Sequence, residues 1–172
     1  MNEYNQEELA HLEGDYHELL ASEQTLLLST VSEEGFPQIS YAPCVRGQDG
    51  TFYIYISELA GHTANLMKNP QASIMFIRAE SESNNLFARE RAVFECSVSE
   101  IMRGEENYQK QLQHLEEKFG GVIKVLRGLA DFHLFALKPE NGRFVAGFGK
   151  AFSIETKSGR LEPITADQLR GS

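Results

Sequence analysis

The sequence predicts a mainly β domain with a few helices. Seven segments rich in β-branched and aromatic residues are separated by polar or Gly-containing stretches, and a short eighth follows. They span residues 24–32, 36–46, 51–57, 71–78, 89–102, 131–137 and 143–148, and the eighth is 153–156. Helical periodicity with polar intervening positions is strongest at 6–21 and 105–119. No repeat or linker divides the chain, so we expect residues 1–172 to form a single domain.

The N-terminal part predicts a helix followed by a β-meander. Leu12, Tyr16 and Leu19 recur at near-helical spacing within the expected helix, residues 6–21. The next three strands, at 24–32, 36–46 and 51–57, are joined by short turns that contain glycine. Such a meander commonly closes into a barrel, because closure removes exposed strand edges.

The middle of the chain predicts one helix between strands and one inserted helix. Residues 57–70 form a short amphipathic pattern that Asn69-Pro70 ends. Strands are expected at 71–78 and 89–102, around a polar loop at 79–85. A helix at 105–119 then stops at Gly120-Gly121, and residues 122–126 form a short helical or irregular link.

The stretch from Leu129 to Phe152 predicts two strands joined by a turn. The strands are 131–137 and 143–148, and Pro139-Glu140-Asn141-Gly142 supplies turn chemistry. Gly147 and Gly149 indicate a bulge or the close approach of another backbone or a flat ligand. A last strand at 153–156 ends the expected barrel, about residues 24–156, before a polar tail at 157–172.

Composition excludes several classes of function. A formal charge of −9 with 16 scattered basic residues argues against nucleic-acid binding. No apolar run reaches the roughly 18 residues of a membrane span, and the acidic N-terminus does not fit a signal peptide. Cys44 and Cys96 form no metal-binding pattern and fit buried, reduced thiols, so we expect a cytoplasmic protein without a membrane partner.

A few polar residues beside apolar strands are candidates for a site, and each has a plain structural reading. His62 opens the helix after the meander, as an exposed histidine or as a contact to an anionic or planar ligand. Arg89 fits a surface charge. Alternation places Arg91 on the face of Val93, where an inward arginine would need a carboxylate or phosphate partner. Asp131 could cap a strand end.

Two further residues are explained without a ligand. His133 faces away from Phe132 and fits a core or interface histidine better than a ligand. Arg143 follows Asn141-Gly142 and fits a surface position at a hairpin. The residues alone therefore predict a β-barrel domain with a candidate cofactor cleft. Zinc-protease, nucleophile-elbow and dinucleotide-binding patterns are not found.

Four motifs in order resemble the HugZ/HutZ haem-utilisation family of pyridoxamine-5′-phosphate-oxidase-like, FMN-binding-fold split barrels. They are QTLLLSTVSEEGFPQISYAPCV, HTANLMKNPQASIMFI, NLFARERAVFE and LADFHLFALKPENGRFVAGFGKAF, within residues 10–156. The resemblance implies a six-stranded antiparallel split barrel that forms a homodimer with ligand clefts at the subunit interface. Flavin-binding relatives hold the FMN phosphate with an Arg-Lys pair, where this chain has Gly61-His62-Thr63. That departure weakens the FMN alternative.

The resemblance also implies haem as substrate and cofactor, degraded with oxygen and electrons for iron acquisition. Arg91 would lie near the haem propionates, with Arg89 among the cofactor-binding residues, and His62 would line the pocket. Asp131 would hydrogen-bond the axial histidine and raise its basicity. Asp131 and Arg91 would be the catalytic residues. Gly147 and Phe148 would face the porphyrin.

The family's axial histidine comes from a C-terminal Gly-His-basic motif, and the sequence ends at Ser172 without one. We expect this ligand from residues beyond Ser172, and none of the five histidines in the chain takes its place. The leading hypothesis is a homodimeric haem oxygenase-type oxidoreductase that uses a separate electron donor. The alternatives are an FMN-binding oxidoreductase of the same fold and a non-catalytic haem store or carrier.

Overall fold

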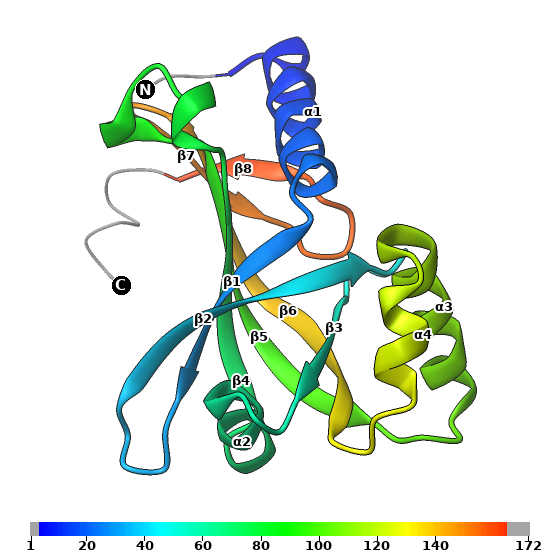
Figure 1. Ribbon diagram of the computed structural model, residues 1–172. Coiled ribbons are helices and arrows are strands. Elements are labelled where there is room, and N and C mark those ends of the chain that lie inside the picture. The colour runs from blue at the N-terminus through cyan, green and yellow to red at the C-terminus, as the bar shows by residue number, and fades with distance from the viewer. Residues whose placement is uncertain (1–3, 165–172) are drawn as a thin grey trace. The chain divides into compact units, whose positions relative to one another are not determined.

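The structure is a computed structural model that describes residues 4–164, and it is mainly β (Figure 1). The α-helices are α1 (Gln6–Ser22), α2 (Gly61–Lys68), α3 (Glu106–Phe119) and α4 (Val122–Arg127). Two 3₁₀ turns, η1 (Glu80–Glu82) and η2 (Leu86–Ala88), lie between the fourth and fifth strands. The strands are β1 (Thr25–Val31), β2 (Pro37–Arg46), β3 (Phe52–Ser57), β4 (Gln71–Ile77), β5 (Arg91–Ile101), β6 (Phe132–Gly147), β7 (Lys150–Ile154) and β8 (Leu161–Pro163).

The first six strands form a closed antiparallel barrel. The strand order is β3-β2-β1-β4-β5-β6-β7-β8, and an additional pairing of β3 with β6 closes the ring. In that pairing, Phe52 lies opposite Leu137 and Ser57 opposite Phe132. Closure leaves β7 and β8 as an extension beyond β6. The prediction of a mainly β, six-stranded antiparallel barrel is confirmed.

The described chain divides into two compact units. The first unit holds residues 4–23, 75–94 and 140–164, and the second holds residues 24–74 and 95–139. Strands β4, β5 and β6 contribute residues to both units. The single-domain organisation expected from the sequence stays a prediction.

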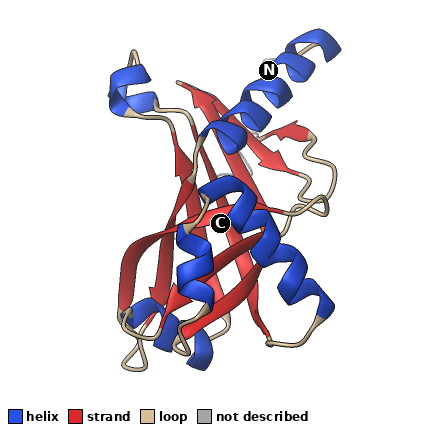
Figure 2. Cartoon of the chain, turned by 45° about the vertical axis from the view of Figure 1, so that its right-hand side comes forward, coloured by secondary structure: helices blue, strands red, loops and turns tan. Residues whose placement is uncertain are grey.

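The second unit has its own apolar core, which α3 and α4, the two helices between β5 and β6, cover. Helices α3 and α4 lie beside each other in both views (Figures 1 and 2). Their apolar faces pack with side chains of β2, β3, β5 and β6 in one cluster. Its buried members are Val45, Tyr53, Tyr55, Ile101, Tyr108, Leu112, Leu115, Ile123 and Leu134.

Aromatic side chains hold the first unit together. Tyr16 of α1 is fully buried, and its ring centroid lies 5.6 Å from that of Phe144 on β6 and 6.5 Å from that of Phe94 on β5. The helix begins with a capping box in which Asn5 and Glu8 exchange hydrogen bonds between side chain and backbone. These contacts explain why the predicted N-terminal helix forms.

The predicted turn at Pro139–Gly142 is wrong, because β6 continues through it as one strand of 16 residues. The strand changes partner there, from β3 up to Leu137 to β7 from Arg143 onward. Pro139, which has no N–H to donate, lies in the gap between these two registers. Gly142 serves close packing, since an added Cβ would lie 2.9 Å from the ring of Phe94.

The C-terminal part also differs from the prediction. The strand expected at 153–156 begins earlier, as β7, and the segment expected to be a polar tail contains β8, which pairs with β7. The rest of that tail, residues 165–172, lies outside the described residues. The other predicted elements are found with shifts of a few residues at their ends. No helix within residues 4–164 is long and apolar enough to span a membrane.

Candidate functional site

In the first unit, a polar hollow of about 280 Å³ lies beside the η1–η2 loop and the end of β6. We call it the Arg89 hollow. It brings together Arg89, Gly147 and Phe148, three of the residues predicted to contact a cofactor. Its full lining is Arg78, Glu82, Ser83, Asn84, Asn85, Ala88, Arg89, Glu90, Ala146, Gly147 and Phe148.

Two arginines, Arg78 and Arg89, and two carboxylates, Glu82 and Glu90, are the charged residues that line this hollow. The Arg78 Nε donates to Glu90 Oε2 at 3.2 Å. Burial lowers the pKa of Arg78, but the hydrogen bond and charge of Glu90 outweigh it, and the pKa is raised overall. The Arg89 Nε and Nη2 donate to the Arg78 carbonyl at 3.1 and 2.6 Å, and Nη1 donates to Glu80 at 3.3 Å. Both cations are therefore held in fixed positions.

Glu90 has spare hydrogen-bonding capacity beside this hollow. Its Oε1 is buried and has no partner within the described residues. A buried carboxylate oxygen without a donor is costly, so an enclosed water molecule is expected to satisfy it. What the hollow offers a ligand is its fixed cations.

The aromatic side of the hollow comes from the turn between β6 and β7. The pairing register shifts between Val145 and Gly147, which confirms the predicted bulge. Gly149 has φ +71°, a left-handed conformation that favours glycine. The turn leaves the Phe148 side chain 82% exposed beside the hollow. An exposed ring at the edge of a polar hollow can cover a flat ligand.

Arg91 does not line the Arg89 hollow. It shares a face of β5 with Val93, as alternation predicts, and this is the outer face, because Ala92 and Phe94 point into the core. The half-buried Arg91 side chain donates through Nη1 to the Arg89 carbonyl at 2.9 Å. Since a guanidinium has five N–H groups, this bond leaves capacity for a carboxylate ligand.

Asp131 and His62 lie in the second unit, around the turn that joins β3 to α2. The Ser57 hydroxyl donates to Asp131 Oδ2 at 2.6 Å, and the Glu58 N–H donates to the Asp131 carbonyl at 2.8 Å. The Thr63 hydroxyl at the start of α2 donates to the Ser57 carbonyl at 2.6 Å. Ser57 thereby links Asp131 to the first turn of the helix that carries His62.

His62 is half-buried in the first turn of α2. Ala60, the N-cap residue of α2, provides no side-chain cap, so the first N–H groups of the helix have no side-chain acceptor there. Burial lowers the pKa of His62, which favours the neutral imidazole. This arrangement allows a hydrogen bond to a ligand but does not by itself create a site.

His133 lies between two carboxylates, which the sequence did not predict. Its Nδ1 is 2.6 Å from Glu100 Oε1, and its Nε2 is 2.6 Å from Glu58 Oε1. Burial lowers the pKa of His133, but hydrogen bonds and charges of Glu100 and Glu58 outweigh it and raise the pKa above its ordinary value. No local pattern indicates this cluster, because Glu100 and Glu58 lie 33 and 75 residues from His133.

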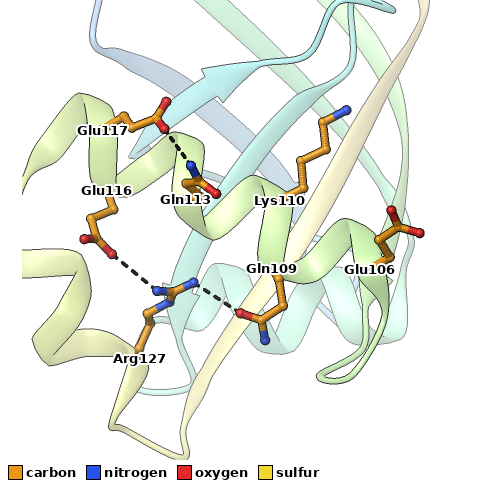
Figure 3. Close-up of a pocket in the computed structure, with 7 residues that line it drawn as sticks. All are labelled: Glu106, Gln109, Lys110, Gln113, Glu116, Glu117 and Arg127. Carbon is orange, nitrogen blue, oxygen red and sulfur yellow. Dashed lines mark hydrogen bonds and ion pairs between the residues drawn. The ribbon is translucent and has the colours of Figure 1, made fainter.

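A second hollow, of about 680 Å³, runs along α3 beside α4 and contains no predicted site residue. Figure 3 shows Arg127 of α4 directed at α3, where it binds Glu116 and Gln109. Three carboxylates and two basic side chains line this second hollow, so its net charge is negative and disfavours an anionic ligand. No group of three or more His, Cys, Asp or Glu within residues 4–164 could hold a metal ion.

Comparison with known proteins connects these features to a family. The family model described as pyridoxamine 5′-phosphate oxidase matches residues 12–146. The chain is 43% identical over 143 residues, 83% of its length, to a Vibrio cholerae protein named heme oxygenase HutZ, and covers 81% of that protein.

Two solved structures are similar to this chain in both fold and sequence. A V. cholerae HutZ structure described as a heme storage protein has a TM-score of 0.72 and 42% identity, covering 75% of this chain and 90% of that one. Campylobacter jejuni ChuZ has a TM-score of 0.82 and 34% identity, covering 96% of this chain and 65% of that one. The chain belongs to the HugZ/HutZ haem-utilisation family of pyridoxamine-5′-phosphate-oxidase-like split barrels.

Proposed function

We propose that this protein binds haem and degrades it as a haem oxygenase-type monooxygenase, releasing iron for use by the cell. The observation that carries the proposal is the 43% identity to heme oxygenase HutZ over 83% of the chain. Bound haem supplies the iron at which oxygen is reduced, and electrons come from a donor outside this chain. The protein's own residues hold and orient the macrocycle.

The Arg89 hollow fits one edge of such a ligand. Haem carries anionic propionates on a flat apolar ring, and the hollow combines fixed arginines with the exposed ring of Phe148. Arg91, on the outer face of β5, has N–H groups left to pair with a propionate. We therefore assign Arg89, Arg91, Gly147 and Phe148 to haem contact. For His62 and Asp131 we keep the roles that the family resemblance implies, His62 as a pocket residue and Asp131 as the partner of the axial histidine.

The size of the hollow suggests that one chain does not enclose the ligand. Pockets that bury most of a drug-sized ligand measure about 300–1,000 Å³. The Arg89 hollow, at about 280 Å³, lies just below that range. A macrocycle would be covered on one side only, and a second copy of the chain would supply the rest.

The outer face of the β1–β2 hairpin is the surface we assign to that homodimer. Leu27 pairs with Tyr41, and Ser29 pairs with Ile39. Ile39 is 77% and Tyr41 66% exposed, and Phe36 in the hairpin turn is also exposed. No charged residue lies among these five. An uncharged apolar face of this kind marks a protein–protein interface.

Substitution of the face tests the homodimer. We expect Ile39→Asp to convert a dimer to a monomer in sedimentation equilibrium, because a buried unpaired carboxylate disfavours association. Val125→Asp, at an exposed apolar residue of α4, is the matched control and should leave the dimer intact. A wild-type monomer, or a dimer that survives Ile39→Asp but not Val125→Asp, would reject this interface.

The Arg91 assignment is tested by haem affinity and turnover. We expect Arg91→Ala to weaken haem binding about 10-fold or more, in line with the roughly 1.5–3 kcal/mol of a charge-assisted hydrogen bond. Arg160→Ala is the control, since Arg160 is exposed and its guanidinium donates to Ser158. Equal affinity and turnover in both variants would remove Arg91 from the site.

A haem store or carrier is the second candidate, because a HutZ structure is itself described as a heme storage protein. The two candidates differ in the fate of the ring. After reduction with ascorbate in oxygenated buffer, an oxygenase loses the Soret band and releases iron that a ferrous chelator captures. A store keeps the Soret band under the same conditions. Catalase in the assay controls for peroxide-driven bleaching.

An FMN-binding oxidoreductase is the third candidate, favoured only by the match to the pyridoxamine 5′-phosphate oxidase family model. Its phosphate would have to bind at the start of α2, where Gly61-His62-Thr63 offers no basic pair. Retention of FMN through purification, seen as a yellow protein, would support this candidate over haem.

A further inference from the structure

The strongest unassigned feature of the second unit is the side-chain cluster around His133, which we call the His133 clasp. It consists of Glu58 in the turn after β3, Glu100 on β5 and His133 on β6. Both ring nitrogens lie 2.6 Å from a carboxylate oxygen. The imidazole is mostly buried, with 19% of its side chain exposed. Three segments thus meet at one ring.

This geometry requires a protonated ring. A carboxylate only accepts hydrogen bonds, so both nitrogens must donate, and only the imidazolium carries two N–H groups. A neutral imidazole keeps one N–H and turns a lone pair toward the other carboxylate. At 2.6 Å that contact is repulsive, so loss of the proton must separate one of the two pairs.

The two carboxylates differ in how easily they can leave. The Glu58 side chain is 57% exposed, whereas that of Glu100 is 31% exposed. Glu58 also lies on a turn, while Glu100 lies within β5. Glu58 is therefore the group that swings into solvent when the proton is lost.

Release of Glu58 would act on the turn that leads into α2. In this turn the Glu58 N–H donates to the Asp131 carbonyl, and the Leu59 N–H donates to the Ser57 hydroxyl. The clasp adds the only side-chain tie between Glu58 and β6 within the described residues. At pH values below the pKa of His133, the Glu58 side chain ties the turn to β6. At pH values above that pKa, this side-chain tie is lost.

We propose that the His133 clasp is a pH-sensitive latch that fixes the β3–α2 turn while His133 is protonated and loosens it on deprotonation. The latch does not depend on what the protein binds. It would make the placement of His62 and Asp131 sensitive to pH across the His133 titration, because His62 follows this turn and Asp131 is hydrogen-bonded to it.

Other charges near the ring do not replace this pairing. Asp131 is two residues away, but its Oδ2 accepts from Ser57. The Arg103 guanidinium donates to the carbonyls of Leu129 and Phe132, beside His133. The raised pKa of His133 has Glu100 and Glu58 as its favourable causes, against the opposing effect of burial. The sign is therefore clear: the latch is closed at low pH and opens as pH rises through the raised pKa.

The proposal is tested by NMR titration of the five histidines in the ligand-free protein, with the His133 signal assigned by His133→Gln. We expect His133 to titrate above the ordinary 6.5. Glu58→Gln and Glu100→Gln should each move its pKa down toward that value, because an amide removes the charge but keeps the shape. Glu117→Gln, at an exposed carboxylate that accepts from Gln113, is the control and should change nothing.

Amide hydrogen exchange at Leu59 provides the second measurement. After correction for intrinsic exchange, protection in the wild type should fall about 2- to 5-fold across the His133 titration, as expected for one partly exposed ion pair. In Glu58→Gln protection should not depend on this titration. The latch is overturned if the pKa of His133 is at or below 6.5, or if neither glutamine variant shifts that pKa. It is also overturned if protection of the Leu59 amide does not change across the His133 titration.

Discussion

Asn65 provides the sharpest test of how α2 is anchored in the second unit. The sequence contains two asparagines in the Asn-Leu-x-x-Asn-Pro element, Asn65 and Asn69, and the structure gives them different roles. The Asn65 side chain is buried, and its Nδ2 donates to Thr30 Oγ1 on β1 and to Gln38 Oε1 on β2, both at 2.9 Å. Asn69, at the end of α2, contributes its backbone.

Asn65→Ala removes both hydrogen bonds and leaves Thr30, which is also buried, without its donor. Two hydrogen bonds contribute about 1 kcal/mol each, and an unsatisfied buried group costs about 1–3 kcal/mol. We expect a loss of about 3 kcal/mol in the free energy of unfolding. For a chain of this size that loss lowers the Tm by about 6–12 °C.

The assay is thermal and urea unfolding followed by circular dichroism, with Asn69→Ala as the matched control. Asn69→Ala should change stability by only about 0.5 kcal/mol, as for a surface position. The account of α2 anchoring is refuted if the two variants are equally stable, or if Asn69→Ala is the more damaging.

Three other perturbations follow from local contacts. Gly142→Ala should cost about 1–3 kcal/mol by forcing a Cβ to within 2.9 Å of the Phe94 ring; an unfolding curve like that of the wild type would refute the close approach. Burial raises the pKa of the Cys44 thiol to about 11, so at pH 8 only about one molecule in a thousand is thiolate. Cys44 should therefore react with a thiol reagent far more slowly in the native state than in urea, and similar rates would contradict its burial. Ser57→Ala should cost about 1–2 kcal/mol in urea unfolding, since Asp131 is partly exposed and loses one charge-assisted hydrogen bond; an unchanged midpoint would remove that link.

The fold could largely be predicted because its signals are local. Tyr16 and other apolar residues of α1 recur at helical spacing. Strands β1 to β3 are short runs of β-branched and aromatic residues that are bounded by turn residues. The failure at Pro139–Gly142 has a different origin. Turn residues there mark a change of partner along one strand and a close packing contact, and both depend on β3, β7 and Phe94, which are distant in sequence.

The candidate site could be predicted only in part. Gly147 and Phe148 lie within one motif, and the structure places both beside Arg89 at one hollow. The partners that fix these residues were not predictable. Arg78 and Glu90 acquire their roles through an ion pair between β4 and β5 flanks, and nothing in their spacing indicates it. The same holds for the Glu58–His133–Glu100 cluster, which only the strand registers bring together.

Titration of the ligand-free protein with haemin, followed in the visible spectrum, tests the central claim most directly. We predict a sharp Soret band that saturates at near-equimolar haemin, which would establish haem as the ligand of this chain. A broad band that grows without saturation and matches that of haemin with an unrelated acidic protein would contradict the haem proposal.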